Sequence, residues 1–262
     1  MNDGFHRQPH AVLDLPSRGQ KAEKIAMLTG IRRMSSPVSL LEVGTGSGGI
    51  AHYFAHLPGI KVDVDAVDVV DSRLLHDGYR FTRVDDVLLP FGDDSFDVVI
   101  SNHVIEHVGD RAQQVSHLRE LRRVLKPGGI VYLAVPNRWM LVEPHYRLRF
   151  LSWLPHRLRT PYLRLRGRGD YYDCEPLERR ELEELAREAG LSYRNISVSG
   201  FRATLAIEGD KGPLARILHA MPDRVLSTLE SAIPTHIYLL AHDEARLATR
   251  VGVRGAVVDV DL

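Results

Sequence analysis

Residues 38–49 read Val-Ser-Leu-Leu-Glu-Val-Gly-Thr-Gly-Ser-Gly-Gly. The β-branched and leucine-rich beginning of this stretch predicts a buried strand, and the glycines that end it predict a sharp turn. The glycine spacing is G-x-G-x-G, whereas the dinucleotide-binding fingerprint is G-x-G-x-x-G and needs an acid about 20 residues further on. The stretch therefore predicts a strand that leads into a loop whose backbone a ligand can approach closely.

The composition is ordinary for a globular chain of 262 residues, with 44% hydrophobic residues and 34 basic residues against 34 acidic ones. This length fits one domain with an insertion. The zero formal charge offers no overall electrostatic argument for a nucleic-acid partner. Cys174 is the single cysteine, which is expected to exclude a disulfide framework and a cysteine-based metal site within the chain. We expect a cytoplasmic protein, because no stretch resembles a signal peptide or a membrane span.

Apolar periodicity predicts that strands and helices alternate along the chain. Expected strands cover residues 38–43, 61–70, 81–84, 96–101, 130–135, 191–199 and 236–241, and expected helices cover 17–34, 50–57, 113–125, 176–189 and 213–231. The Lys-Pro-Gly-Gly stretch at 126–129 is expected to end the helix before it. Strands this apolar, alternating with helices, predict a parallel sheet that is covered on both faces.

Acidic and polar residues stand where the predicted strands end. Asp68 lies about 20 residues after Gly48, and Asp85-Asp86-Val87 begins a stretch that continues to Leu-Pro-Phe and Phe-Asp-Val. The fourth strand ends in Ser101-Asn102-His103, and Arg-Val-Leu-Lys-Pro-Gly-Gly at 123–129 precedes the fifth. In open α/β sheets, ligands bind beyond the carboxyl ends of the strands, so these groups are expected to meet at one site.

These motifs, in this order over residues 38–136, resemble those of class I S-adenosylmethionine-dependent methyltransferases, in particular the methyltransferase type 11-like group. The resemblance implies an α/β fold with a seven-stranded Rossmann-like doubly wound sheet, mostly parallel with an antiparallel final strand. It also implies S-adenosyl-L-methionine as the cofactor. The residues that it assigns to the cofactor are Glu42, Gly44, Thr45, Gly46, Gly48, Asp68, Val69, Asp85, Asp86, Val87, Asn102 and His103.

The resemblance also gives several of these residues a role. Glu42 would attract the ammonium of the cofactor, Asp68 would accept from both ribose hydroxyls, and Asp85 would accept from the adenine amino group. The backbone of Asp86 and Val87 would face the adenine edge. The sequence departs from the family pattern in lacking a glycine before Asp85 and in having Asp86 in place of a small residue.

Methyl transfer to oxygen needs a base near neutral pH, for which histidine is the usual residue. The candidate catalytic bases are His145, which lies after the fifth strand, and His103, which follows the fourth. His107 is expected to be structural, and for each histidine a packing or surface role is an equal alternative. No group of His, Asp and Glu shows clear ligand spacing, so no metal site is predicted.

Residues 147–169 depart most from a minimal enzyme of this class. They hold seven arginines interleaved with leucines and aromatic residues, and Pro155 and Pro161 are expected to divide them into short helical pieces. Three roles are open: a lid with inward apolar residues, a binding surface for an anionic acceptor, or peripheral contact of residues 147–168 with an anionic inner membrane surface. Nucleic acid is disfavoured, because the segment is short and rich in leucine.

The chain is therefore expected to have five parts. These are a flexible lead-in at 1–16, a cofactor-binding half at 17–137, a basic amphipathic cap or acceptor insertion at 138–175, the remainder of the methyltransferase domain at 176–244 and a tail at 245–262. The predicted function is methyl transfer to a small-molecule or lipid-linked acceptor, at oxygen. Two alternatives are a catalytically silent regulatory or scaffold subunit that binds the cofactor, and a nicotinamide-dependent enzyme, which the glycine spacing and Asp85 disfavour.

Overall fold

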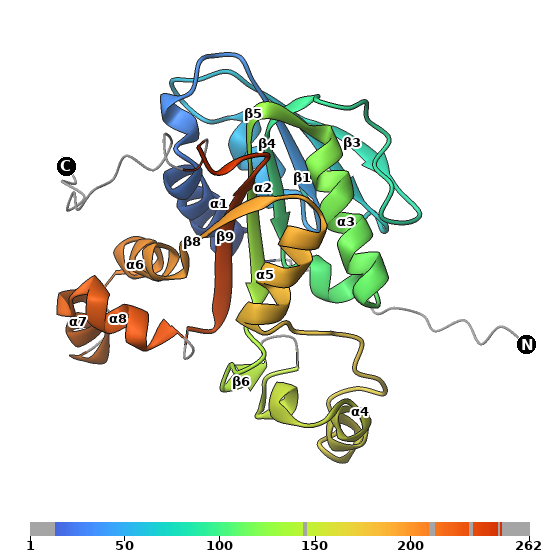
Figure 1. The fold of residues 1–262 in the computed structure, drawn as a ribbon, viewed down its shortest axis with the longest axis vertical. Helices are drawn as coiled ribbons and strands as arrows, with labels where there is room; N and C mark the ends of the chain where they lie inside the picture. Colours follow the sequence, from blue (N-terminus) through green and yellow to red (C-terminus); the bar gives the residue numbers. More distant parts are fainter. Residues whose placement is uncertain (1–13, 144–145, 210–212, 231–232, 246, 248–262) are drawn as a thin grey trace, which may run out of the picture.

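The computed structural model describes residues 14–143, 146–209, 213–230, 233–245 and 247. Its centre is a seven-stranded sheet in the order β3-β2-β1-β4-β5-β9-β8 (Figure 1). The strands are β1 (Val38–Val43), β2 (Val62–Asp68), β3 (Arg80–Arg83), β4 (Phe96–Asn102), β5 (Leu125–Pro136), β8 (Ser192–Asn195) and β9 (Thr235–Ala241). Around it lie α1 (Leu15–Thr29), η1 (Ile31–Arg33), α2 (Gly49–Ala55), η2 (Ile105–His107), α3 (Arg111–Val124), α5 (Arg179–Glu188), α6 (Ser197–Glu208), α7 (Pro213–Ala220) and α8 (Asp223–Thr228).

The sheet is parallel from β3 to β5 and then changes direction. β1 pairs in parallel with β2 and β4, β2 with β3, and β4 with β5. β9 lies antiparallel between β5 and β8. The predicted doubly wound sheet, mostly parallel with an antiparallel final strand, is confirmed. The strand order reverses between β1 and β4, which is the position where ligands bind in open sheets of this kind.

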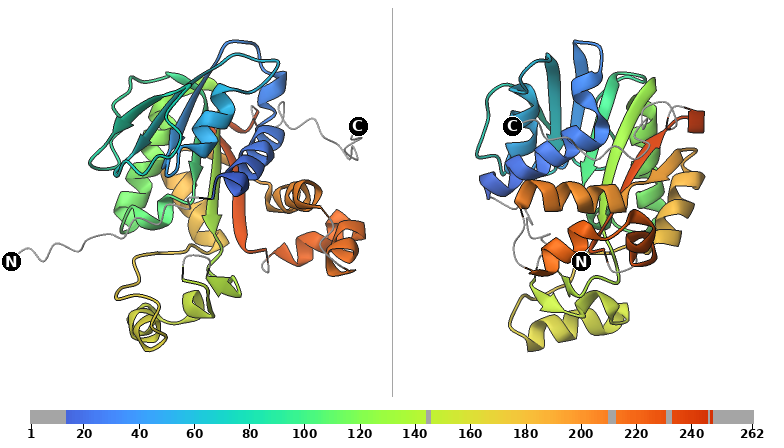
Figure 2. Two further views of the ribbon diagram at one scale, coloured as in Figure 1. Left: turned by 180° about the vertical axis from the view of Figure 1, so that it is seen from behind. Right: turned by 90° about the vertical axis from the view of Figure 1, so that its left-hand side faces the viewer.

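Helices cover both faces of the sheet, and each face has its own apolar core. Neighbouring residues of β1 point to opposite faces, so Leu40 belongs to the cluster with Phe54 of α2, and Leu41 to the cluster with Leu121 of α3. The left-hand view of Figure 2 shows α1 and α2 in front of the sheet, with α3 and α5 behind it. The two layers explain why the central strands are apolar on both sides.

Several predicted boundaries are wrong. The expected strand at 191–199 ends at Asn195, and α6 begins at Ser197. α3 ends at Val124, just before residues 126–129 as expected, but these residues belong to β5, whose pairing with β4 is irregular between Phe96 and Val98. The expected lead-in at 1–16 overlaps α1, which begins at Leu15, and its residues up to 13 lie outside the described part of the chain. The expected tail at 245–262 also lies outside it, apart from Ala245 and Leu247.

Residues 138–175 form a separate lobe beyond the end of β5, here called the insert (Figure 1). It contains β6 (Val142–Glu143), β7 (Leu148–Arg149), η3 (Leu151–Trp153) and α4 (His156–Leu165). Its apolar core consists of Tyr146, Leu148, Leu151, Leu163, Tyr172 and Cys174. Pro161 lies inside α4 rather than dividing it, and Arg159 and Leu163 on either side of it are buried in the insert. Among the described residues, no helix has the length and apolar character needed to cross a membrane.

Candidate functional site

The loop that joins β1 to α2 lies close to two other connections. Gly44 and Gly48 have φ angles of 83° and 80°, a left-handed conformation that favours glycine. A Cβ atom at Gly44 would come within 2.4 Å of Val104 Cγ2, and one at Gly48 would lie 2.4 Å from the carbonyl oxygen of Leu75. Glycine at these positions therefore allows the loop to fit between the segment after β4 and the β2–β3 connection.

Glu42 lies at the end of β1 and is almost fully buried. Its Oε2 accepts a 3.0 Å hydrogen bond from the N–H of Ala51 in the first turn of α2. Burial raises the pKa of Glu42 to about 8, and the positive charge of Arg18 on α1 opposes this rise. A further cation near the carboxyl would favour its charged form, so an ammonium group suits this position. That contact stays a prediction, while the structure adds a second role in holding the start of α2.

Asp68, at the end of β2, reaches the glycine loop directly. Its Oδ2 accepts from the N–H of Gly46 at 2.8 Å, and its Oδ1 accepts from the N–H of Val69 at 2.7 Å. Thr45 Oγ1 donates to the carbonyl of Val67 at 3.1 Å, which ties the loop to the same strand. A carboxylate has about four acceptor positions, so Asp68 retains capacity for ribose hydroxyls. The side chain of Val69 is exposed beside it and offers an apolar surface to a flat ring.

The predicted adenine-edge residues lie in the connection from β3 to β4. Asp85 and Asp86 are exposed, and Val87 is half-buried. Asp86 Oδ1 accepts from the N–H of Leu88 at 2.7 Å, which makes a local turn. The structure thus places these residues on the same edge of the sheet as Asp68, and their contacts with adenine stay predictions.

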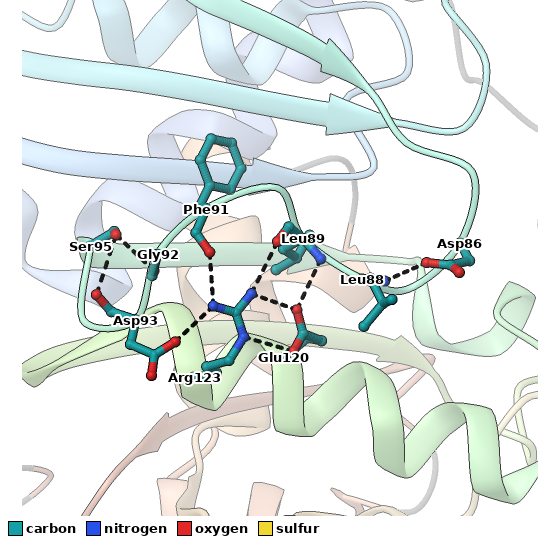
Figure 3. Close-up of polar contacts among 9 residues, drawn as sticks. All are labelled: Asp86, Leu88, Leu89, Phe91, Gly92, Asp93, Ser95, Glu120 and Arg123. Atoms are coloured by element: carbon teal, nitrogen blue, oxygen red, sulfur yellow. Dashed lines mark hydrogen bonds and ion pairs between the residues drawn. The ribbon is translucent and has the colours of Figure 1, made fainter.

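Arg123 of α3 holds this connection in place (Figure 3). Its guanidinium donates to the carbonyls of Leu89 and Phe91 at 3.0 and 2.8 Å. It also pairs with Asp93 at 2.9 Å and with Glu120 at 2.7 Å. Glu120 in turn accepts from the N–H of Leu89 at 2.9 Å. The sequence analysis missed Glu120, although its three-residue spacing from Arg123 on one helix could have suggested the pair.

β4 ends in polar groups at the predicted methyl-transfer face. The Nδ2 donor of Asn102 is buried and has no hydrogen-bond partner in the described structure. Such a donor is destabilising unless a ligand satisfies it, which makes Asn102 a strong candidate for ligand contact. His103 has a left-handed backbone with φ of 59°, and its Nδ1 lies 3.3 Å from Oε1 of the buried Glu106. Strained conformations of this kind cluster at functional sites.

α1 adds basic residues that the sequence analysis did not assign to the site. Burial and the nearby charges of Arg18 and Lys24 lower the pKa of Lys21 to about 8, while Glu106 opposes this effect. Burial also lowers the pKa of Arg18, against the charge of Glu42. The sequence signal for these basic residues was that Arg18, Lys21 and Lys24 interrupt the otherwise apolar face of α1. α1 therefore contributes positive charge near the ends of β1 and β4.

His107 contacts the end of the insert. Its Nδ1 lies 3.7 Å from Cys174 Sγ, and Asp173 Oδ1 lies 3.8 Å from the same sulfur. One donor atom from each of these residues lies within 4.8 Å of the others, a spacing that could hold a metal ion. The expectation that a single cysteine excludes any such group is therefore too strict. Burial raises the pKa of the Cys174 thiol, which opposes metal binding there. His145, the other candidate base, lies outside the described residues.

A cavity of about 920 Å³ lies between the insert and the segment after β4. Its lining includes Glu106, His107, Arg138, Tyr146, Arg159 and Tyr172. This volume is within the range of small-molecule sites, roughly 300–1,000 Å³. Two residues that follow β4 therefore face the same cavity as the arginines and tyrosines of the insert.

The sheet order, the glycine loop at the reversal between β1 and β4 and the acids at the strand ends define a Rossmann-like fold of the methyltransferase type. Residues 41–133 match the family model of a methyltransferase domain. This part of the chain is therefore a class I S-adenosylmethionine-dependent methyltransferase domain, as the motifs predict.

Curated relatives of this chain are also named as methyltransferases. An uncharacterized methyltransferase of Mycobacterium leprae is 36% identical over 140 residues, which are 50% of this chain and 51% of the relative. A demethylmenaquinone methyltransferase of Chlorobaculum parvum is 32% identical over 121 residues, 44% of this chain and 49% of the relative. The chain thus spans about half the length of the curated relatives that it matches.

Solved structures share the fold. A chain from the complex of the Haloferax volcanii Trm112 methyltransferase activator with its proposed methyltransferase is 18% identical, with a TM-score of 0.53 over 90% of this chain and 98% of that one. A proposed sarcosine dimethylglycine methyltransferase from Galdieria sulphuraria is also 18% identical, with a TM-score of 0.50 over 87% and 86%. At this identity, the likeness is one of fold alone.

S-adenosylmethionine is the cofactor of this domain, and the residues present fit it. The glycine cradle leaves no room for a Cβ atom at Gly44 or Gly48. Asn102 has an unsatisfied donor, and Asp68 has acceptor capacity that its present bonds do not use. Glu42, the glycine loop, Asp68 and Asn102 would hold the cofactor.

Proposed function

We propose that the chain transfers a methyl group from S-adenosylmethionine to a small-molecule or lipid-linked acceptor, at an oxygen atom. The main observation that supports this proposal is the 920 Å³ cavity beside the insert. Glu106 and His107, which line it, follow His103 at the end of β4 by three and four residues. An acceptor in the cavity would thus lie next to the segment that is predicted to face the methyl group.

The lining of the cavity favours an acceptor with a flat ring and a polar or anionic group. Tyr171 is exposed and offers an aromatic surface, and Arg138 offers donors that suit oxygen atoms. Relatives from Chlorobaculum parvum and Chlorobaculum tepidum are named demethylmenaquinone methyltransferase, which supports a quinone-type acceptor. We therefore favour a quinol or phenol as the acceptor.

His103 is the proposed general base. The cofactor supplies an electrophilic methyl group on its sulfonium. As the acceptor oxygen forms its new bond to the methyl carbon and the S–C bond breaks, the hydroxyl proton would pass to His103 Nε2. His103 Nδ1 faces Glu106, whose carboxylate would orient the ring and stabilise the imidazolium. The insert would exclude water from the cavity.

The outer surface of the insert supports a lipid-linked form of the acceptor. Trp139, Phe150 and Trp153 are 42–45% exposed, and Trp153 packs edge to face against both of the others. Leu158 and Leu165 of α4 are 53% and 83% exposed. Six of the seven arginines between 147 and 168 are exposed as well. Exposed aromatic and leucine side chains beside cations suit an anionic lipid surface. A lid with inward apolar residues does not account for these exposed side chains.

Turnover with a panel of phenols and quinols tests the proposal, with S-adenosylhomocysteine formation as the readout. We expect His103→Gln to lower kcat at least about 100-fold and to leave S-adenosylmethionine affinity within about threefold. His107→Gln, which also lies at the cavity, is the matched control and should keep most of the activity. No turnover with any acceptor by a chain that binds the cofactor would instead support a catalytically silent subunit.

Flotation with anionic vesicles tests the lipid contact separately. The chain should float with vesicles that contain phosphatidylglycerol and should remain at the bottom with neutral vesicles. Replacing Arg149, Arg157, Arg166 and Arg168, which are exposed and lie outside the cavity lining, by glutamine should abolish flotation without loss of turnover on a water-soluble quinol. Flotation that is unchanged in this variant would contradict the contact.

A further inference from the structure

His52, His56 and Asp77 bring three metal-ligand side chains together outside the proposed active site. His52 lies in α2, and His56 follows one turn later at its C-terminal end. The two imidazole rings therefore lie on one face of the helix, with centroids 4.3 Å apart. Asp77 comes from the β2–β3 connection, so the group joins two segments that are separate in the sequence.

The distances match those of a tetrahedral metal centre. Asp77 Oδ1 lies 3.3 Å from His52 Nδ1, and Asp77 Oδ2 lies 3.6 Å from His56 Nε2. One donor atom from each residue lies within 4.8 Å of the others. With zinc–ligand bonds of about 2.0–2.2 Å, two donors of a tetrahedral site lie about 3.3–3.6 Å apart. Each separation therefore has the length of one edge of such a site, although the two are measured to different oxygens of the Asp77 carboxylate.

The ring nitrogens are arranged as they are in metal sites. His56 Nδ1 lies 2.8 Å from the carbonyl oxygen of His52, while its Nε2 faces Asp77. Metal-binding histidines usually donate their other N–H to a carbonyl or carboxylate, which fixes the ring and the tautomer. His52 Nδ1 is buried and makes no hydrogen bond within the described residues. Its neighbour is the Asp77 carboxylate at 3.3 Å, so a metal ion between the two would take up both donor atoms.

We propose that His52, His56 and Asp77 bind one divalent transition-metal ion of the Zn²⁺ class, with water in the remaining position. Two imidazoles and one carboxylate suit Zn²⁺ better than Mg²⁺ or Ca²⁺, which prefer oxygen ligands. The sequence analysis predicted no metal site because Asp77 lies 21 residues after His56. The His-x-x-x-His spacing on α2 was the available signal.

The ion would join α2 to the β2–β3 connection beside the glycine loop. Leu74 and Leu75 in this connection donate their N–H groups to the carbonyl of Ser47 at 2.9 and 3.3 Å. A Cβ atom at Gly78 would lie 2.6 Å from His56 Cε1, so the connection already packs closely on the ring. The role is therefore structural, and it does not depend on the proposed methyl transfer.

Zn²⁺ titration of the untagged full chain against a chromophoric chelator tests the site. The experiment uses a Cys174→Ser background, which removes the other group of possible ligands around His107. We expect one equivalent of Zn²⁺ to bind. His52→Gln, His56→Gln and Asp77→Asn should each weaken binding at least tenfold, because even changes to outer-shell partners of a metal commonly cost 10–100-fold. His76→Gln changes an exposed histidine next to Asp77 and is the matched control, which should bind as before.

Thermal unfolding gives a second readout. Saturating Zn²⁺ should raise the Tm of the parent chain and of His76→Gln, because the ion binds the folded state, and it should not raise the Tm of Asp77→Asn. Asp77 is exposed in a connection, so this variant is expected to fold even if a histidine variant does not. Absence of a bound equivalent, or equal affinity in Asp77→Asn and the parent chain, would overturn the proposal.

Discussion

Replacing Glu42 by glutamine is expected to stabilise the fold at pH 9 and to change it little near pH 5. The carboxyl is almost fully buried, and burial raises its pKa to about 8 from an ordinary value of 4.5. Glutamine has nearly the same shape and can still accept from the N–H of Ala51. The substitution therefore removes the ionisation while it keeps the hydrogen bond.

The sign and size follow from the difference between the two pKa values. The folded state holds the proton more tightly than the unfolded chain, so the contribution of this group to stability is fully present below pH 4.5. It is lost as the pH rises from 4.5 through about 8. Each pH unit of this difference corresponds to about 1.4 kcal/mol, so the loss at pH 9 is on the order of 5 kcal/mol. Glu42→Gln has no carboxyl group at this position to ionise, so its free energy of unfolding should not fall in this way as the pH rises.

Urea unfolding of both chains between pH 5 and pH 9 measures the effect. The difference in unfolding free energy should grow with pH in favour of Glu42→Gln. Glu184→Gln, at an exposed position of α5, is the control and should show no such trend. The same Glu42 substitution should weaken S-adenosylmethionine binding, because the predicted partner of the ammonium is lost. A stability difference that stays constant from pH 5 to pH 9 would refute the reasoning.

Three further substitutions test other parts of the site. Gly44→Ala should lower the free energy of unfolding by about 2–3 kcal/mol, measured in urea. The φ angle of 83° at this position disfavours a Cβ atom, which would also overlap Val104. The second substitution Val104→Ala should therefore restore part of the lost stability. Asp68→Asn should weaken S-adenosylhomocysteine binding by tenfold or more in calorimetry, and unchanged affinity would remove Asp68 from the ribose site. Arg159→Met removes a buried guanidinium and should speed proteolysis within the insert, whereas the exposed Arg157→Met should not.

The parallel half of the sheet could be predicted from the sequence because its signals are local. Each central strand is a short apolar run that ends in glycine or in a polar residue, so its position depends little on the rest of the fold. α6 could not be predicted in this way. Its Ser-Val-Ser-Gly beginning lacks helix signals, and Gly200 is there because a Cβ atom would lie 2.4 Å from Ile237 of β9. Tertiary packing decides the structure at that point.

The same distinction holds for the candidate site, where some residues could be predicted from the sequence and some contacts could not. Residues at strand ends, such as Asp68 and Asn102, could be placed from their order in the chain. The contacts of Glu120 with Leu89 and of His107 with Cys174 were not expected, because these partners lie far away in the sequence. His107 was expected to be structural, which stays a prediction, and the structure adds that it lines the cavity. Side chains that touch across distant segments leave no periodic pattern, so only the structure shows them.

The two ends of the insert leave the sheet side by side. Asn137 and Leu177 form a β-bridge, and the N–H of Arg138 donates to the carbonyl of Leu177 at 3.3 Å. A segment whose ends already meet can be exchanged at a small entropic cost of loop closure. If the insert binds the acceptor as proposed, its replacement by another segment of similar ends would change the acceptor and leave the residues for the methyl donor in place.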